Sequence, residues 1–165
     1  MDAYQVANWH DLFVAELGAS TALAGLVFVG VSINLKQVMS YPWLPGRALE
    51  AILMLVMVLV ASTLVLVPGQ PAWTLGAEVL LAALLTWAGV AVIHRHAFST
   101  IIPELRRQLL ARVVLGEAVM VAFALSGVSL VAQAGGGLYW LVPAVVLATV
   151  SAVANAWVLL VEVTR

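Results

Sequence analysis

Glutamates inside long apolar runs are the residues of this sequence best suited to chemistry. Glu16 and Glu78 lie near one set of run ends, and Glu50, Glu117 and Glu162 lie toward the other. If the runs cross a membrane, an ionisable side chain at a helix centre costs about 2.5–3.5 kcal/mol, so its presence needs a reason. One reason is the binding of a proton or small cation. The other is hydrogen bonding that holds helices together.

Glu50 and Glu117 differ in the partners that the sequence offers them. Arg47 precedes Glu50 by three residues, which on a helix predicts a local ion pair at the end of a span. Arg112 precedes Glu117 by five residues and so lies on a different helix face. The partner of Glu117 is therefore expected on another helix, and Arg112 is expected at the membrane interface.

The last apolar run carries a polar face of its own. Ser151, Asn155 and Glu162 recur at spacings of four and seven residues, which places them on one side of a helix. Asn155 could reach Glu117 at a similar depth. Hydrogen bonding between helices stays an open role for all these residues. The candidate ion or proton site comprises Glu50, Glu117, Asn155 and Glu162.

The composition predicts the elements that position these residues. With 64% hydrophobic and 9% charged residues and a mean hydropathy of +1.12, the 165-residue chain has too little polar surface for a water-soluble globule. Runs of about 20 apolar residues cross the bilayer as helices, because lipid offers backbone groups no other partner. We predict an all-α, polytopic bundle, a single transmembrane domain over residues 1–165. Its five spans are expected at about 12–35, 49–67, 73–93, 109–134 and 138–163.

The basic residues predict the orientation of the bundle. All seven fall on one side of these spans, at Lys36, Arg47, Arg95, Arg106, Arg107, Arg112 and Arg165. Cytoplasmic loops accumulate such residues, so the N-terminus is predicted outside and the C-terminus in the cytoplasm. The segment 95–108 is expected to be the one sizeable loop. Within it, Pro103 and Glu104 could form the first helical turn leading into the fourth span.

Two similar hairpins are expected. Tight turns at 68–71 and 135–137 join the second run to the third and the fourth to the fifth. An offset of 67 residues aligns Glu50 with Glu117. A parallel repeat of this kind predicts that both glutamates lie at the same depth.

The first run is rich in small residues. Gly18, Ala22 and Gly25 form a helix-packing face that would let another helix approach closely. This face could pack centrally against both hairpins, or it could line a subunit interface or a permeation path. Because five short-looped helices bury little surface alone, a homo-oligomer is expected.

Signatures of enzymes and metal sites are lacking. The sequence has no cysteine and no HExxH, GxSxG or phosphate-binding glycine loop. His94 and His96 point apart on a helix, so we expect them to flank the interface rather than bind a metal. The expectation is a non-enzymatic protein without cofactor or metal, in contact with the lipid bilayer and not with nucleic acid.

Several motifs resemble those of a group of small bacterial, often actinobacterial, integral membrane proteins. They are WHDLFV at 9–14, GASTALAGLVFV at 18–29, SINL at 32–35, LPGRA at 44–48 and VPGQ at 67–70. Some members carry the label "modulator of FtsH protease". The resemblance covers chiefly the first half of the chain, implies a bacterial inner-membrane protein and assigns no functional residue.

Two classes of function fit these features. An oligomeric channel or transporter-like protein would use the first span and the carboxylates for protons or small ions. A non-catalytic interaction protein would bind a larger membrane complex, such as a membrane protease, through its spans. Acids at matched depth favour the first class, because an adaptor has little need of them.

Overall fold

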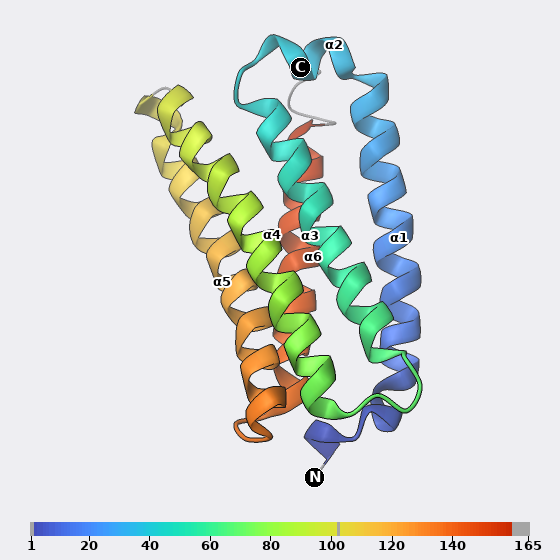
Figure 1. Cartoon of the computed structure of the whole chain (residues 1–165). Coiled ribbons are helices and arrows are strands. Elements are labelled where there is room, and N and C mark those ends of the chain that lie inside the picture. The colour runs from blue at the N-terminus through green and yellow to red at the C-terminus, as the bar shows by residue number, and fades with distance from the viewer. Residues whose placement is uncertain (1, 102, 160–165) are drawn as a thin grey trace.

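The computed structural model describes residues 2–101 and 103–159, and these residues are almost entirely helical, without a strand (Figure 1). With their adjoining 3-10 turns, five helices are long and apolar enough to cross a membrane. They are α1 (His10–Ile33), α3 (Leu44–Val65), α4 (Ala72–Thr100), α5 (Arg106–Ala132) and α6 (Leu141–Trp157). The predicted all-α membrane fold is confirmed. Glu162 and Arg165 lie outside the described residues.

Short helices fill the connections. Helix α2 (Leu35–Ser40) follows α1, and the 3-10 turns are η1 (Asp2–Tyr4), η2 (Val6–Trp9), η3 (Pro103–Leu105) and η4 (Gly137–Trp140). The predicted loop at 95–108 is much shorter than expected, because α4 continues to Thr100. The predicted helical turn at Pro103 is confirmed, since η3 leads directly into α5. The Thr100 hydroxyl donates to the His96 carbonyl at 3.0 Å, so a polar residue near the end of α4 finds its partner within the helix. Helix α4 ends at Thr100, where the backbone of Ile101 turns extended with φ of −76° and ψ of 140°.

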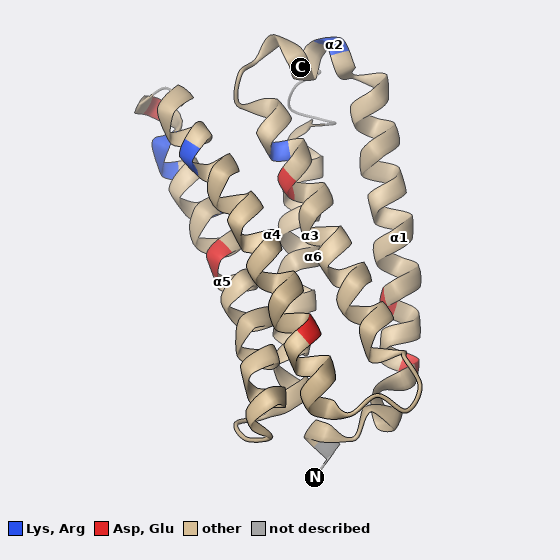
Figure 2. Ribbon diagram, viewed as in Figure 1, with Lys and Arg blue, Asp and Glu red and all other residues tan. Residues whose placement is uncertain are grey.

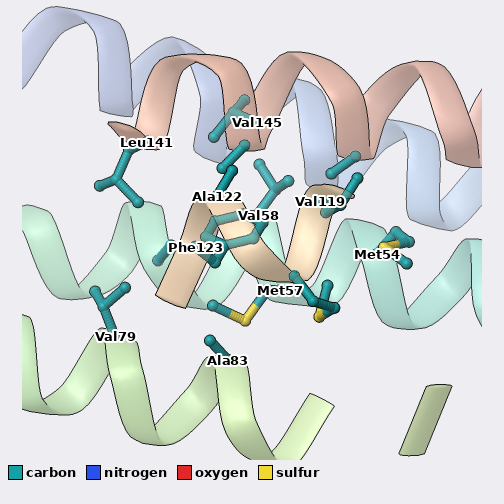
Figure 3. Packing of buried hydrophobic residues seen from close by; sticks show 14 of the residues in the cluster. Met54, Met57, Val58, Val79, Ala83, Val119, Ala122, Phe123, Leu141 and Val145 are labelled. Atoms are coloured by element: carbon teal, nitrogen blue, oxygen red, sulfur yellow. The ribbon is translucent and has the colours of Figure 1, made fainter. Parts of the chain in front are cut away.

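Helix α3 packs against three of the other long helices. It contacts α1, α4 and α6, while α5 packs on α4 and α6. Fully buried side chains such as Met57, Val58 and Phe123 fill the space between the helices (Figure 3). Helix α1 lies at the edge of the bundle, against α3 and with little contact to α6. The expectation that the first span packs centrally against both hairpins is therefore wrong.

The small-residue face of α1 points away from its own chain. Gly18, Ala22 and Gly25 are all exposed. A Cβ atom added at Gly18 or Gly25 would meet nothing within 4 Å. Phe13, Ser20 and Val27 form the opposite, buried face. Lipid or another protein must therefore cover the small-residue face.

Helices α4 and α5 approach each other closely at two glycines, Gly76 and Gly127. A Cβ atom at Gly127 of α5 would lie 2.7 Å from the Leu80 Cβ and 2.9 Å from the Gly76 carbonyl oxygen on α4. A Cβ atom at Gly76 would lie 2.7 Å from the backbone nitrogen of Val131. These two glycines let the backbones of α4 and α5 touch, as small residues do in lipid.

The basic residues gather at one end of the bundle (Figure 2). This basic end comprises α2, the start of α3 and the junction between α4 and α5. The opposite end holds both hairpin turns, and we call it the turn end. Gly69 and Gly136 sit there with φ of 71° and 111°, a left-handed backbone that favours glycine. The Gly136 N–H donates to the hydroxyl of Tyr4 at 3.2 Å, which ties the N-terminal segment to the turn end.

Candidate functional site

Four ionisable side chains from α3, α4 and α5 meet in the half of the bundle nearer the basic end. The Arg112 Nε lies 2.7 Å from the Glu50 Oε2. The His94 Nε2 lies 3.3 Å from the Glu50 Oε1, and the His94 Nδ1 lies 3.6 Å from the Glu117 Oε1. We call Arg112, Glu50, His94 and Glu117 the carboxylate cluster.

Glu50 forms the buried end of this cluster. Its side chain is 0% exposed, and its cationic partner is Arg112 rather than Arg47. The predicted local pair is therefore wrong, because Glu50 lies on the buried face of α3 with Ala51 and Met54 and turns toward the neighbouring helices. Arg112 is also buried and does not extend to the interface as expected. Pairing across helices offsets two charges that would each be unfavourable alone in an apolar interior.

His94 lies between the two carboxylates. It is only 4% exposed, so the expectation that it flanks the interface is wrong. His96 is exposed, which confirms that the two rings point apart. Gly116 makes room for the contact, since a Cβ atom there would lie 3.3 Å from the His94 Cε1 and 3.4 Å from the Glu50 Oε1.

Glu117 forms the open end of the cluster. The Trp87 indole N–H donates to the Glu117 Oε2 at 2.7 Å, so the partners of Glu117 come from another helix, as predicted. Its side chain is 38% exposed on the surface of the bundle. One imidazole contacts both Glu50 and Glu117, so the two carboxylates lie close to each other. Their equal depth in a membrane stays a prediction. The internal repeat itself stays a prediction.

The polar residues of α6 do not join the cluster. Asn155 and Ser151 are buried, and the Asn155 Nδ2 and Ser151 Oγ have no hydrogen-bond partner among the described residues. The predicted contact between Asn155 and Glu117 is wrong, because Glu117 turns to Trp87 and His94 on α4. Glu78 accepts a hydrogen bond from Gln70 near the turn end, far from the other carboxylates along the helix.

One imidazole lies between the two carboxylates of this cluster. With its proton on Nε2, His94 donates to Glu50 and leaves Nδ1 facing Glu117. At 3.6 Å the contact with Glu117 is too long for a hydrogen bond. The cluster therefore places the His94 ring, a group that can bind a proton, beside a partly exposed carboxylate.

Sequence reasoning missed His94 as a site residue, although a signal was present. Val79, Ala83, Val90 and Ala97 mark the buried face of α4, and His94 falls in the same register. A histidine on the buried face of a span needs a polar partner, and the carboxylates on neighbouring spans were the candidates.

No protein-family model, curated protein or solved structure matches this chain. The geometry of the carboxylate cluster is therefore the basis for assigning a function to the protein. Across 2–101 and 103–159, no three His, Asp or Glu side chains are arranged to hold a metal ion.

Proposed function

We propose that this protein is a proton-handling, channel- or transporter-like protein of the bacterial cytoplasmic membrane. The observation that carries the proposal is the imidazole of His94 held between Glu50 and Glu117 inside a membrane-spanning bundle. Imidazole is the side chain that most readily gains and loses a proton near neutral pH. Carboxylate–imidazole series of this kind mark proton relays in membrane proteins.

Protons fit the cluster better than metal cations. Glu50 already has a guanidinium counter-charge at 2.7 Å, so it offers little attraction to a second cation. The group between the two carboxylates is an imidazole, which would occupy the position a bound cation needs. A proton requires no displacement of His94, because it binds to the ring itself.

A proton could reach the cluster from the surface of the bundle through Glu117. Glu117 is partly exposed at the bundle surface, whereas Glu50 is fully buried, so a proton would enter at Glu117 and pass to His94. Beyond the cluster, toward the turn end, Met57, Val58 and Phe123 fill the core. A route across the membrane would therefore run along the surface of the bundle, where a second copy can line it.

Because such a route needs a second copy beside it, we propose that the protein forms a homo-oligomer. Glu117 would be a partly exposed carboxylate facing lipid in an isolated chain, which is unfavourable. Helix α1 and the α4–α5 pair form opposite edges of the bundle (Figure 1). The simplest assembly is a ring in which the α1 face of one copy meets the α4–α5 edge of the next. The basic end would face the cytoplasm, as the distribution of Lys and Arg predicts.

One observation favours the second function, a non-catalytic interaction protein. An apolar cavity of about 340 Å³ lies between α1 and α6, lined by residues such as Leu23, Leu26, Val153 and Trp157. A hydrophobic helix of a larger membrane complex would fit against such a surface. This function makes no use of the carboxylate cluster, so a transport measurement separates the two.

The test is proton flux into vesicles that contain the purified protein and a pH-sensitive dye. Glu117→Gln keeps an acceptor for the Trp87 N–H but cannot titrate, so we expect flux to fall to that of protein-free vesicles. Glu78→Gln is the matched control, since it makes the same change near the turn end and should leave flux intact. Wild-type flux in Glu117→Gln would count against the proton function and favour the interaction protein.

A further inference from the structure

The open end of the carboxylate cluster lies well inside a membrane-spanning helix. Glu117 is about 16 Å along α5 from the start of that helix, yet its side chain is 38% exposed. Val114 and Val121, one turn before and one turn after it, are exposed apolar side chains. On α4, Leu84 is exposed one turn before Trp87. A carboxylate therefore reaches the surface of the bundle among apolar side chains.

The charges of the cluster do not cancel. Glu50 and Arg112 form an ion pair at 2.7 Å, whereas the hydrogen-bond donor to Glu117 among the described residues is the neutral N–H of Trp87. Helix α6, which also packs on α5, has no titratable side chain along its length. While His94 is neutral, one negative charge therefore remains, and it lies on Glu117. Such a charge in apolar surroundings is unfavourable until a counter-charge approaches it.

Few counter-charges can reach Glu117 from the membrane. The α1 face of a second copy could cover this carboxylate but not neutralise it, because α1 contains no Lys or Arg. A metal ion such as Ca²⁺ or Mg²⁺ needs about six oxygen ligands, and here a single carboxylate lies among apolar side chains. A proton can reach the site, and so can an organic cation that dissolves in lipid.

We propose that Glu117 binds lipophilic organic monocations at the α4–α5 surface, in exchange for a proton. The proposal rests on the proton function above, because proton and cation would share one negative charge. A large cation with its charge spread over apolar groups is weakly hydrated, so it can approach Glu117 from the lipid without displacing His94. A proton on either residue removes the net charge and the attraction. Proton and cation should therefore exclude each other.

The experiment measures the binding of tetraphenylphosphonium to the purified protein in a non-ionic detergent by isothermal titration calorimetry. Tetraphenylborate has nearly the same size and shape but a negative charge, so it reports non-specific uptake by the micelle. We expect saturable binding of the cation alone. Binding should be tighter at about pH 8 than at about pH 5, since imidazole changes its charge over this range. Titrations in two buffers of different ionisation enthalpy should show a proton released as the cation binds.

Three variants test whether Glu117 is responsible. Glu117→Gln keeps an acceptor for the Trp87 N–H but removes the charge, so the apparent affinity should fall by more than about tenfold. Glu117→Asp keeps the charge and should retain saturable binding. Glu16→Gln is the matched control, because Glu16 is a carboxylate of α1 that lines an apolar cavity against α6. It should bind the cation like the wild type.

Several outcomes would overturn the cation site. They are no saturable binding to the wild type, equal binding to Glu117→Gln, and binding that does not change with pH. Proton flux in vesicles separates this proposal from the proton function. Flux without cation binding would overturn the cation site and leave the proton function intact. Cation binding that depends on Glu117, in a protein that conducts no protons, would support the cation site and count against proton transport alone.

Discussion

Glu50→Gln is expected to destabilise the folded bundle by about 3–5 kcal/mol, because it leaves Arg112 as an uncompensated buried charge. The two groups lie 2.7 Å apart with side chains 0% and 8% exposed, so water screens the remaining charge only weakly. The change also weakens the contact of Glu50 with His94, which joins α3 to α4. Thermal unfolding in detergent measures the effect as a large drop in Tm.

A double variant shows whether the pair is the cause. Glu50→Leu with Arg112→Met replaces both charges by apolar groups of similar size, and we expect it to recover much of the lost stability. The double variant should then lose less stability than Glu50→Leu and Arg112→Met lose in sum, and the difference measures the coupling between the two sites. Wild-type Tm for Glu50→Gln alone would mean that Glu50 and Arg112 do not form this pair.

Gly127→Ala is expected to destabilise the bundle by about 1–3 kcal/mol through overpacking between α4 and α5. The new Cβ would meet the Leu80 Cβ at 2.7 Å and the Gly76 carbonyl oxygen at 2.9 Å, and neither atom can move without shifting a helix backbone. Because α4 carries His94 and α5 carries Glu117, separating these helices should also lengthen the contact between the two residues. Unfolding temperature and proton flux should fall together.

Gly18→Ala makes the same chemical change at a position where the new Cβ meets nothing within 4 Å. We expect its unfolding temperature to match or slightly exceed that of the wild type, since alanine favours helix more than glycine does. If both glycine variants unfold at the same temperature as the wild type, the close α4–α5 contact is not present in the protein.

Much of the fold follows from the sequence, because long hydrophobic runs predict membrane-spanning helices. Their length and composition predict five helical spans, and the turns at 68–71 and 135–137 predict which helices are joined. The helix ends are less predictable. The segment 95–108 looks like a loop from its charges, yet polar side chains extend α4 beyond the apolar run.

The site is predictable only in part. An ionisable residue is easy to recognise in an apolar span, but the sequence does not show which residue of another helix it pairs with. Glu117 was expected to pair with another helix and does. The partner of Glu50 was sought nearby in sequence, whereas it comes from α5. Which residue pairs with Glu50 depends on how α3 and α5 are rotated about their axes. The packing of the whole bundle determines these rotations. The sequence left two roles open for the small-residue face of α1 for a similar reason, since glycines that meet a neighbouring helix and glycines that face away from the bundle look alike in sequence. The structure rules out central packing within the chain, and a subunit interface stays a prediction.

The most direct test of the proton function is flux through His94→Gln in reconstituted vesicles. The glutamine amide can still donate to Glu50 but cannot gain or lose a proton, so the bundle should fold while the relay is broken. We predict helical content and elution volume like those of the wild type, with flux no greater than in protein-free vesicles. Proton flux in His94→Gln equal to that of the wild type, or a wild-type protein that conducts no protons, would contradict the account.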